Sequence, residues 1–185
     1  RLIPRFYDPD AGTVLIDGLD VRSYSREALL GKVSFALQKS ELFSATVREN
    51  ISWGKPDATD EEIRAAAAAA QADEFIAKLP EGYDTLLTEG GTSLSGGQRQ
   101  RVALARALVK QSDFFCWMSR CPIWMRSSGV RPGKELVKIH EIYHQTMVYV
   151  THDQIEAMTI GQRIAVFIMV HPDAGYTCQC VSPSV

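Results

Sequence analysis

The stretch Leu94-Ser95-Gly96-Gly97-Gln98 decides how this sequence is interpreted. It predicts the start of a helix that runs to about residue 110, because a serine before two glycines is typical of a helix N-terminus. The apolar side of this helix consists of Val102, Leu104, Ala105 and Leu108. The first N–H groups of a helix are unpaired and attract anions, and glycines let a phosphate approach the backbone without meeting a Cβ atom. An isolated Ser-Gly-Gly string is more often an ordinary helix start, so the surrounding sequence has to decide.

Strand and helix patterns alternate on both sides of this stretch. The predicted strands cover residues 13–16, 33–37, 146–150 and 163–167, and the predicted helices include residues 25–30 and 134–144. Thr59 and Glu62 form a capping-box pattern before an alanine-rich helix, and Asp17-Gly18 predicts a tight turn. Such alternation indicates a mostly parallel α/β sheet. Residues 40–110 are almost entirely helical by pattern, which predicts a helical lobe inserted into that sheet.

Composition and charge exclude several classes of protein. The chain has 185 residues, of which 45% are hydrophobic and 23% charged, as expected for one packed domain rather than a disordered or fibrous chain. The formal net charge of −2 argues against a basic nucleic-acid binder. No apolar run approaches the roughly 20 residues of a membrane-spanning helix. The four cysteines, at positions 116, 121, 178 and 180, form no CxxC pair, which argues against a zinc ribbon and indicates a reducing compartment.

Several motifs in order resemble the ATP-binding cassette (ABC) family of transporter ATPases. LSGGQRQR followed by ARAL resembles the signature motif of that family, and residues 5–18 resemble the segment after its phosphate-loop helix. Gln38 lies where the family has its Q-loop glutamine, and His152 lies where it has its switch histidine. The resemblance extends over residues 1–114 and 134–167. It implies an α/β fold of the P-loop NTPase type, with a mostly parallel sheet and an inserted helical subdomain.

The resemblance also implies what individual residues do. In this family two cassettes enclose two ATP molecules head to tail, and the signature of one cassette contacts the γ-phosphate held by the other. The residues implied in ATP binding are Ser95, Gly96, Gly97 and Gln98. Gln38 would contact Mg²⁺ or the attacking water, since an amide oxygen suits a hard cation. His152 would hydrogen-bond the γ-phosphate and position the water.

The implied partners are a second cassette and the transmembrane domains or subunits of a transporter. Leu42, Phe43 and Ser44 would lie near the coupling helix of the membrane subunit. The chain would then be a nucleotide-binding domain on the cytoplasmic face of a membrane, coupling ATP hydrolysis to solute transport. No nucleic-acid partner is expected.

The sequence departs from the family pattern at two places. The phosphate-loop motif GxxxxGK[ST] is absent, so we interpret residues 1–185 as a partial ATP-binding domain. Residues 115–133 replace the expected strand ending in Asp-Glu and contain no acid. Reading this segment one base earlier permits the string LLDEPLSNLDAKLR, and the Trp117/Met118 and Trp124/Met125 junctions must both encode Asp. We therefore predict a frameshift over residues 115–133.

The two halves resemble different subfamilies. Residues up to about 94 resemble an exporter, and those beyond about 110 resemble a sugar importer, with the reading frame restored by Lys134. The sequence therefore leaves the direction of transport open. The predicted organisation is a helical signature subdomain at about 40–110, the frameshifted segment at 115–133 and a divergent tail at 168–185. Because both phosphate-binding and acidic motifs are missing, we expect no measurable ATP hydrolysis by this chain alone.

Two other functions compete with this interpretation. His140-Glu141-Ile142-Tyr143-His144 matches HExxH, in which two histidines on one helix face bind Zn²⁺ and the glutamate acts as a base. This short pattern recurs on solvated helices, and a third ligand at the usual spacing is missing. The other alternative is a decayed cassette that binds a partner without chemistry. Metal analysis would separate the zinc hydrolase from an ATPase, and nucleotide binding would separate the interaction module.

Overall fold

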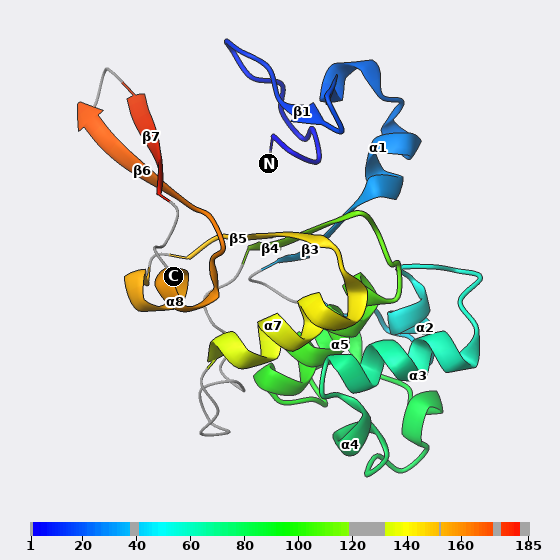
Figure 1. The fold of residues 1–185 in the computed structure, drawn as a ribbon. Helices are drawn as coiled ribbons and strands as arrows, with labels where there is room; N and C mark the ends of the chain where they lie inside the picture. The colour runs from blue at the N-terminus through cyan, green and yellow to red at the C-terminus, as the bar shows by residue number, and fades with distance from the viewer. Residues whose placement is uncertain (1, 38–40, 119–131, 152, 172–174, 182–185) are drawn as a thin grey trace.

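A three-stranded parallel sheet forms the centre of the computed structural model (Figure 1). The described residues are 2–37, 41–118, 132–151, 153–171 and 175–181. The sheet has the order β3-β4-β5, with β3 at Val33–Leu37, β4 at Phe114–Met118 and β5 at Thr146–Tyr149. In this register Phe35 lies opposite Cys116, and Trp117 lies opposite Tyr149. The predicted α/β class with a parallel sheet is therefore confirmed, including the strand predicted at residues 33–37.

Helices connect these strands, as parallel pairing requires. Between β3 and β4 the chain forms α2 (Val47–Ser52), α3 (Asp60–Ala69), α4 (Asp73–Ile76), the 3-10 turns η2 (Gly82–Asp84) and η3 (Glu89–Gly91), and α5 (Gly96–Leu108). Helix α7 (Pro132–Tyr143) precedes β5. In Figure 1 these helices lie together on one side of the sheet.

Three of these helices begin with a capping box. In this motif the side chain of the N-cap residue accepts a hydrogen bond from the N–H group three residues later, and the side chain of that later residue accepts one from the N–H group of the N-cap residue. The pairs are Thr46 with Glu49 in α2, Thr59 with Glu62 in α3, and Ser95 with Gln98 in α5. The box predicted at Thr59 is thus present, and the predicted helix after Ser95 is α5. Because each box uses residues only three positions apart, local sequence fixes these helix starts.

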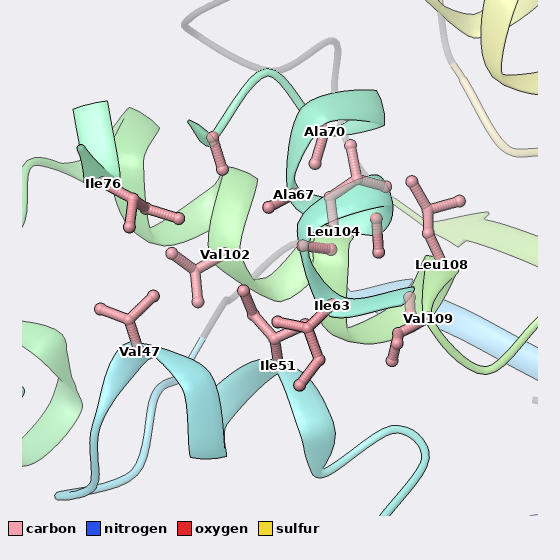
Figure 2. Packing of buried hydrophobic residues seen from close by; sticks show 14 of the residues in the cluster. Val47, Ile51, Ile63, Ala67, Ala70, Ile76, Val102, Leu104, Leu108 and Val109 are labelled. Atoms are coloured by element: carbon pink, nitrogen blue, oxygen red, sulfur yellow. The ribbon is translucent and has the colours of Figure 1, made fainter. Parts of the chain in front are cut away.

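The main hydrophobic core joins the helices to one face of the sheet (Figure 2). Its labelled members are Val47, Ile51, Ile63, Ala67, Ala70, Ile76, Val102, Leu104, Leu108 and Val109. The face of α5 predicted to be apolar is buried here, since Val102, Ala105 and Leu108 are fully covered. Burying each large aliphatic side chain stabilises the fold by roughly 1.5–3 kcal/mol. Helix α5 is therefore anchored along its length, which holds its N-terminus in place.

Side chains of β4 alternate between the two faces of the sheet. Phe115 and Trp117 join the main core, while Cys116 joins a smaller cluster on the other face with Val33 and Leu29. Trp117 is only 3% exposed, and its indole N–H group has no hydrogen-bond acceptor among the described residues. An unpaired buried donor costs about 1–3 kcal/mol. The central strand therefore carries a side chain that does not suit its position.

We predict that replacing the indole N–H group of Trp117 with sulfur stabilises the protein. The isostere benzothienylalanine keeps the ring and removes the unpaired donor, so the free energy of unfolding should rise by about 1 kcal/mol. Urea denaturation measures this change. The same replacement at Trp53, which is 66% exposed, should change it by less than about 0.5 kcal/mol. Equal effects at both positions would contradict the packing described for β4.

The N-terminal part forms a small layer on the other side of the sheet (Figure 1). It contains β1 (Leu15–Ile16), β2 (Leu19–Asp20), the 3-10 turn η1 (Val21–Ser23) and α1 (Arg26–Lys32). The predicted turn joins β1 to β2, with φ of 52° at Asp17 and 77° at Gly18. Ser25 caps α1, which confirms the helix predicted at 25–30.

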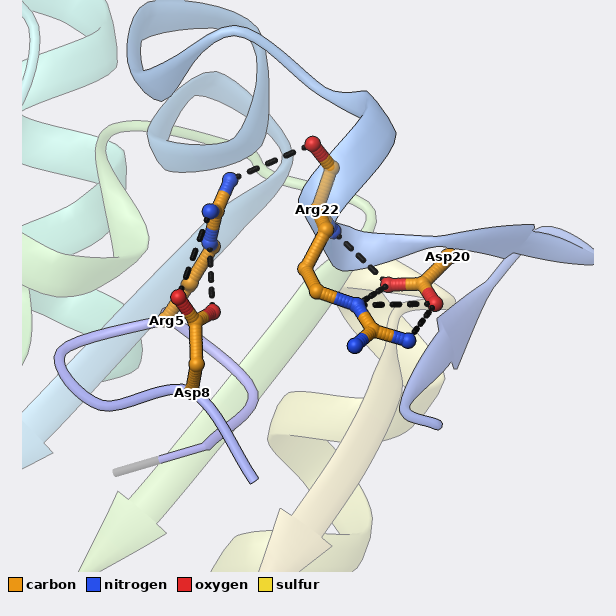
Figure 3. Close-up of polar contacts among 4 residues, drawn as sticks. All are labelled: Arg5, Asp8, Asp20 and Arg22. Atoms are coloured by element: carbon orange, nitrogen blue, oxygen red, sulfur yellow. Dashed lines mark hydrogen bonds and ion pairs between the residues drawn. The ribbon is translucent and has the colours of Figure 1, made fainter. Parts of the chain in front are cut away.

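Two arginine–aspartate pairs tie this layer together (Figure 3). Arg5 Nε donates to Asp8 at 2.7 Å, and Arg22 Nη2 donates to Asp20 at 2.6 Å. Arg5 Nη1 also donates to the carbonyl oxygen of Arg22 at 3.3 Å, which joins the two pairs. The hydrogen bonds from Arg5 and Arg22 lower the pKa of Asp8 and of Asp20, respectively.

These shifts predict a loss of stability in acid. A carboxyl group whose pKa is lowered on folding stabilises the protein above its unfolded pKa of about 3.9, and this contribution disappears as the pH falls through the folded value. NMR titration should show Asp8 and Asp20 ionising below about pH 3.9. In Arg5→Met the pKa of Asp8 should return toward its ordinary value while Asp20 changes little. An unshifted Asp8 in the parent chain would contradict the pairing.

The C-terminal part differs from the expectation. Helix α8 (Gln154–Ile160) is followed by β6 (Ile164–His171), which pairs antiparallel with β7 (Gly175–Val181) and lies outside the parallel sheet. The strand predicted at 163–167 is thus longer, and β7 lies in the region interpreted as a divergent tail. Strands that follow closely along the chain pair readily as antiparallel neighbours, which explains the difference. Among the described helices, none combines the length and hydropathy needed to cross a membrane.

Candidate functional site

The turn at residues 95–98, called here the 95–98 turn, forms the N-terminus of α5. Ser95 Oγ accepts a hydrogen bond from the N–H group of Gln98 at 3.3 Å, and Gln98 Oε1 accepts one from the N–H group of Ser95 at 2.8 Å. Among the described residues, the N–H groups of Gly96 and Gly97 have no acceptor. Two adjacent amides therefore remain available at the positive end of a 13-residue helix.

The 95–98 turn is accessible. Ser95 and Gly96 are exposed, while Gly97 and Gln98 are half-buried. Among the described residues, the one neighbour within 4 Å of a Cβ atom on Gly96 would be the Arg99 Nη2 atom, at 4.0 Å. There is thus room for an oxyanion beside the amide of Gly96. The Ser95 oxygen is occupied as a cap acceptor, but its hydroxyl hydrogen can still donate.

A guanidinium group lies beside the 95–98 turn. Arg99 Nη1 donates to the carbonyl oxygen of Leu94 at 2.6 Å and to that of Gly91 at 3.4 Å. These bonds fix the cation next to the N-terminus of α5 without neutralising it. The positive potential of the helix end and of Arg99 therefore add, which favours an anionic ligand.

Glycine is required at position 91, which packs closely against Leu42 and Arg99. Its φ is 65°, and a Cβ atom there would lie 2.9 Å from Leu42 Cδ1 and 3.2 Å from Arg99 Cδ. A side chain would be both strained and overpacked at this position. This close contact places Leu42 against Gly91, a few residues before the 95–98 turn.

An open groove of about 810 Å³ lies beside the 95–98 turn. Its lining residues are Glu41, Leu42, Phe43, Ser44, Glu89, Gly90, Thr92, Gly96, Arg99 and Gln100. Leu42, Phe43 and Ser44, which the resemblance placed near a membrane subunit, thus lie in its wall. The exposed ring of Phe43 packs on that of Trp53, with centroids 4.7 Å apart. Trp53 could not be singled out from the sequence, because the exposure of an aromatic side chain becomes visible only in the fold.

Two predicted site residues, Gln38 and His152, lie outside the described residues, as does Trp124. The strands before them are described: β3 and β5 flank β4 in parallel, so their carboxyl ends lie at one edge of the sheet. After β5, Thr151 donates to Glu156 at 2.9 Å, and Asp153 caps α8. The carboxyl ends of β3 and β5 therefore lie at the same end of the sheet, which is where ligands bind in open α/β sheets.

The HExxH pattern does not form the geometry of a zinc site. Helix α7 ends at Tyr143, and His144 has a left-handed φ of 50°. A ring nitrogen of His140, Nδ1, lies 3.0 Å from the carbonyl oxygen of Gln145. Within the described parts of the chain, no group of three His, Cys, Asp or Glu side chains could hold a metal ion. These residues thus form the end of a helix. The described structure does not support the alternative function of a zinc hydrolase.

The chain matches a known protein family. The family described as "ABC transporter" matches residues 1–117. That match ends inside β4, two residues after the start of the segment interpreted as frameshifted.

Individual relatives agree with this family. The chain is 56% identical over 109 residues to a putative multidrug export ATP-binding/permease protein, YgaD, of Bacillus subtilis, covering 59% of the chain and 19% of that protein. It is 53% identical over 111 residues to the mitochondrial potassium channel ATP-binding subunit of Homo sapiens, covering 60% and 15%. The chain therefore spans less than a fifth of either relative.

A solved structure shows the same fold. A bacterial Atm1-family ABC exporter with ATP bound superposes with a TM-score of 0.77 at 34% identity. The superposition covers 89% of this chain and 29% of the exporter chain. The similarity thus extends beyond the region that the family match covers.

Proposed function

The chain belongs to the ABC transporter family, and from this premise we propose that its 95–98 turn binds the terminal phosphate of ATP held by a second cassette. As a nucleotide-binding domain, it is an ABC-type ATPase by family and an ATP-binding protein of the P-loop NTPase class. The observation that carries the proposal is the pair of adjacent amides, at the exposed Gly96 and the half-buried Gly97, that have no acceptor among the described residues. The 95–98 turn would supply contacts that the ATP-holding cassette lacks.

Electrostatics support a phosphate rather than a neutral ligand. The γ-phosphate carries the most exposed negative charge of ATP, and backbone N–H groups at a helix N-terminus suit such oxygens. Arg99 adds a fixed positive charge beside them. Ser95 can donate its hydroxyl hydrogen while its oxygen still caps α5. Bringing two cassettes together over ATP would remove water from this contact and strengthen it.

The proposed reaction is in-line attack of water on the γ-phosphate, coupled to solute movement. Gln38 and His152 are proposed to position the water and the phosphate from the edge of the sheet. Mg²⁺ would neutralise charge on the phosphates, and the amide oxygen of Gln38 is the ligand this chain would offer. These roles rest on the family resemblance and on the positions of β3 and β5.

The groove at residues 41–44 and 89–100 is the proposed docking place for a coupling helix of a membrane subunit. Its wall contains the exposed ring of Phe43, which suits the apolar face of a helix. The relative YgaD is described as an ATP-binding/permease protein, so one chain of that relative combines ATP binding with a permease. The domain would then lie at the cytoplasmic face of the membrane through its partner.

We also propose the domain organisation inferred from sequence: a helical signature subdomain at 40–110, a frameshifted segment at 115–133 and a divergent tail at 168–185. The end of the family match at residue 117 and the unpaired indole of Trp117 both support the frameshift. Sequencing the coding DNA across codons 110–135 tests it. Codons whose frame one base earlier does not read LLDEPLSNLDAKLR would overturn it.

This chain should not hydrolyse ATP by itself. It contains neither GxxxxGK[ST] nor the acidic pair expected after β4, so it lacks the lysine, the phosphate-binding loop and the group that polarises water. Phosphate release by the purified chain with ATP and Mg²⁺ should equal that of a buffer blank. Turnover above the blank that co-purifies with the chain would contradict this expectation.

Association with a complete cassette tests the proposed function. The chain is mixed with a cassette of the same family that carries GxxxxGK[ST] and whose catalytic glutamate is replaced by glutamine. Sedimentation should show association with ATP that is about tenfold or more tighter than with ADP, because only ATP presents a γ-phosphate to the turn. Equal association with ATP, ADP and no nucleotide would refute the proposal.

A further inference from the structure

An open cavity of about 690 Å³ lies between helix α3 and the end of helix α7 and is called here the α3–α7 cavity. Ala65, Ala68 and Ala69 line it from α3, and Ile142 and Tyr143 line it from α7. It shares no described residue with the 95–98 turn or with the groove beside that turn. Sites for small molecules have volumes of about 300–1,000 Å³, so the α3–α7 cavity has the size of such a site.

Backbone contacts on both sides of Gln145 hold this residue at the α3–α7 cavity. The N–H group of His144 donates to the carbonyl oxygen of His140 at 2.8 Å, where α7 ends. The N–H group of Thr146 donates to the carbonyl oxygen of Asp113 at 3.0 Å, where β5 begins. Gln145 is therefore fixed between the end of a helix and the start of a central strand.

The side-chain amide of Gln145 lacks the hydrogen-bond acceptor that its burial requires. Gln145 is 5% exposed, and its Nε2 atom has no acceptor among the described residues. A buried donor without an acceptor is costly, and native proteins seldom keep one without a reason. Gln145 also belongs to the residues that line the α3–α7 cavity. A molecule in this cavity is thus in a position to supply the missing acceptor.

The described lining of the α3–α7 cavity carries no charge at neutral pH. It consists of alanine methyl groups, the side chain of Ile142, the ring of Tyr143 and the amides of Gln111 and Gln145. Burial raises the pKa of Tyr143, so its hydroxyl group stays neutral. An ionised ligand would lose water here without gaining a counter-charge, which favours a neutral ligand.

We propose that the α3–α7 cavity binds a neutral small molecule that combines an apolar body with a carboxamide group, and that the carboxamide pairs with Gln145. The ligand's carbonyl oxygen accepts from Nε2, and its N–H group donates to Oε1, so that the donor and the acceptor of both amides are used. Nε2 is shielded from solvent, so the terminal amide of Gln145 turns toward the cavity when the ligand enters. The torsion that moves it has a broad minimum. The alanine methyl groups and Ile142 contact the apolar body.

NMR titration of the full chain with benzamide tests this proposal, because benzamide joins a neutral ring to one carboxamide. It should shift the methyl signals of Ala65, Ala68 and Ala69 and the side-chain amide signals of Gln145. The shifts should saturate with a dissociation constant of about 1–10 mM, as expected for a fragment of this size. Benzoate has the same shape but is charged and cannot donate, so it should bind at least about tenfold more weakly.

Gln145→Met keeps the length of the side chain and removes its hydrogen-bonding groups. It should weaken benzamide binding at least about tenfold. Its thermal stability should not fall below that of the parent, since Nε2 has no acceptor among the described residues. Gln111→Met is the matched control, because Gln111 also lines the cavity but is exposed. Its amide is already solvated, so this replacement should change binding less than about twofold.

Ala68→Leu tests the same cavity without altering Gln145. Ala68 is exposed on α3, and leucine is a good helix former, so the fold should be retained. The larger side chain should occupy the cavity and weaken benzamide binding at least about fivefold.

Three outcomes would overturn the proposal: no saturable shift in the parent chain, undiminished binding in Gln145→Met or Ala68→Leu, or benzoate binding as tight as that of benzamide. The titration contains neither nucleotide nor a second cassette. Its failure would therefore leave the proposed ATP contact standing, and failure of the association experiment would leave the α3–α7 cavity standing.

Discussion

Gly96→Asp should weaken the ATP-dependent association with a complete cassette by about 100-fold or more, without loss of folding. At an effective dielectric constant of about 20, two like unit charges about 5 Å apart repel each other by about 3 kcal/mol, which exceeds a 100-fold change in affinity. The structure has room for the side chain, because a Cβ atom on Gly96 meets only Arg99 Nη2, at 4.0 Å. An acidic residue in the first turn of a helix is also favourable for its stability.

Gly96→Asn is the matched control, since it has the same shape without the charge. It should weaken association much less than the aspartate does, and thermal unfolding of both variants should match that of the parent. Sedimentation with ATP measures the association. If asparagine and aspartate weaken it equally, shape rather than charge governs the contact, and the phosphate assignment of the 95–98 turn is wrong.

Gly54→Ala should lower the free energy of unfolding by about 3 kcal/mol, a large effect for one added methyl group. The new Cβ atom would lie 2.0 Å from the carbonyl oxygen of Arg106 and 3.1 Å from Val109 Cγ1, so α2 and α5 would have to move apart. The carbonyl oxygen belongs to a helix backbone and cannot yield as a flexible side chain would. Urea denaturation measures the change.

Gly31→Ala provides the comparison for this prediction. Gly31 lies in α1, and a Cβ atom there meets none of the described residues within 4 Å. Its replacement should raise the free energy of unfolding by about 0.5–1 kcal/mol, because alanine loses less backbone entropy in a helix. If Gly54→Ala were as harmless as Gly31→Ala, the close approach of α2 to α5 would be refuted.

Local patterns in the sequence predicted the local features of the fold. A capping box needs residues only three positions apart, and the Asp17-Gly18 turn needs only two residues that tolerate positive φ. The box at Thr46 and Glu49 was not singled out, although it has the same spacing as the one at Thr59. The parallel sheet followed from alternation of strands and helices. The 95–98 turn was predicted from its resemblance to the signature motif together with the neighbouring motifs, because an isolated Ser-Gly-Gly string is more often an ordinary helix start.

Contacts between distant segments were not predictable in the same way. Arg106 and Asn50 are 56 positions apart, and nothing in their neighbours indicates that they meet. The groove combines residues 41–44 with residues 89–100, so it exists only after α5 packs on α2. β7 was missed because strand pairing depends on the partner as well as on the strand itself. Gln38 and His152 remain predictions from resemblance, supported by the positions of β3 and β5.

Photochemical labelling from the γ-phosphate tests the central proposal most directly. ATP with a photoreactive group on its γ-phosphate is mixed with this chain and a complete cassette, irradiated, and the labelled peptides are identified by mass spectrometry. We predict a label on this chain within residues 95–99 that disappears in Gly96→Asp and persists in Gly96→Asn. Labelling confined to the partner cassette, or on this chain only at segments away from the start of α5, would contradict the assignment of the 95–98 turn.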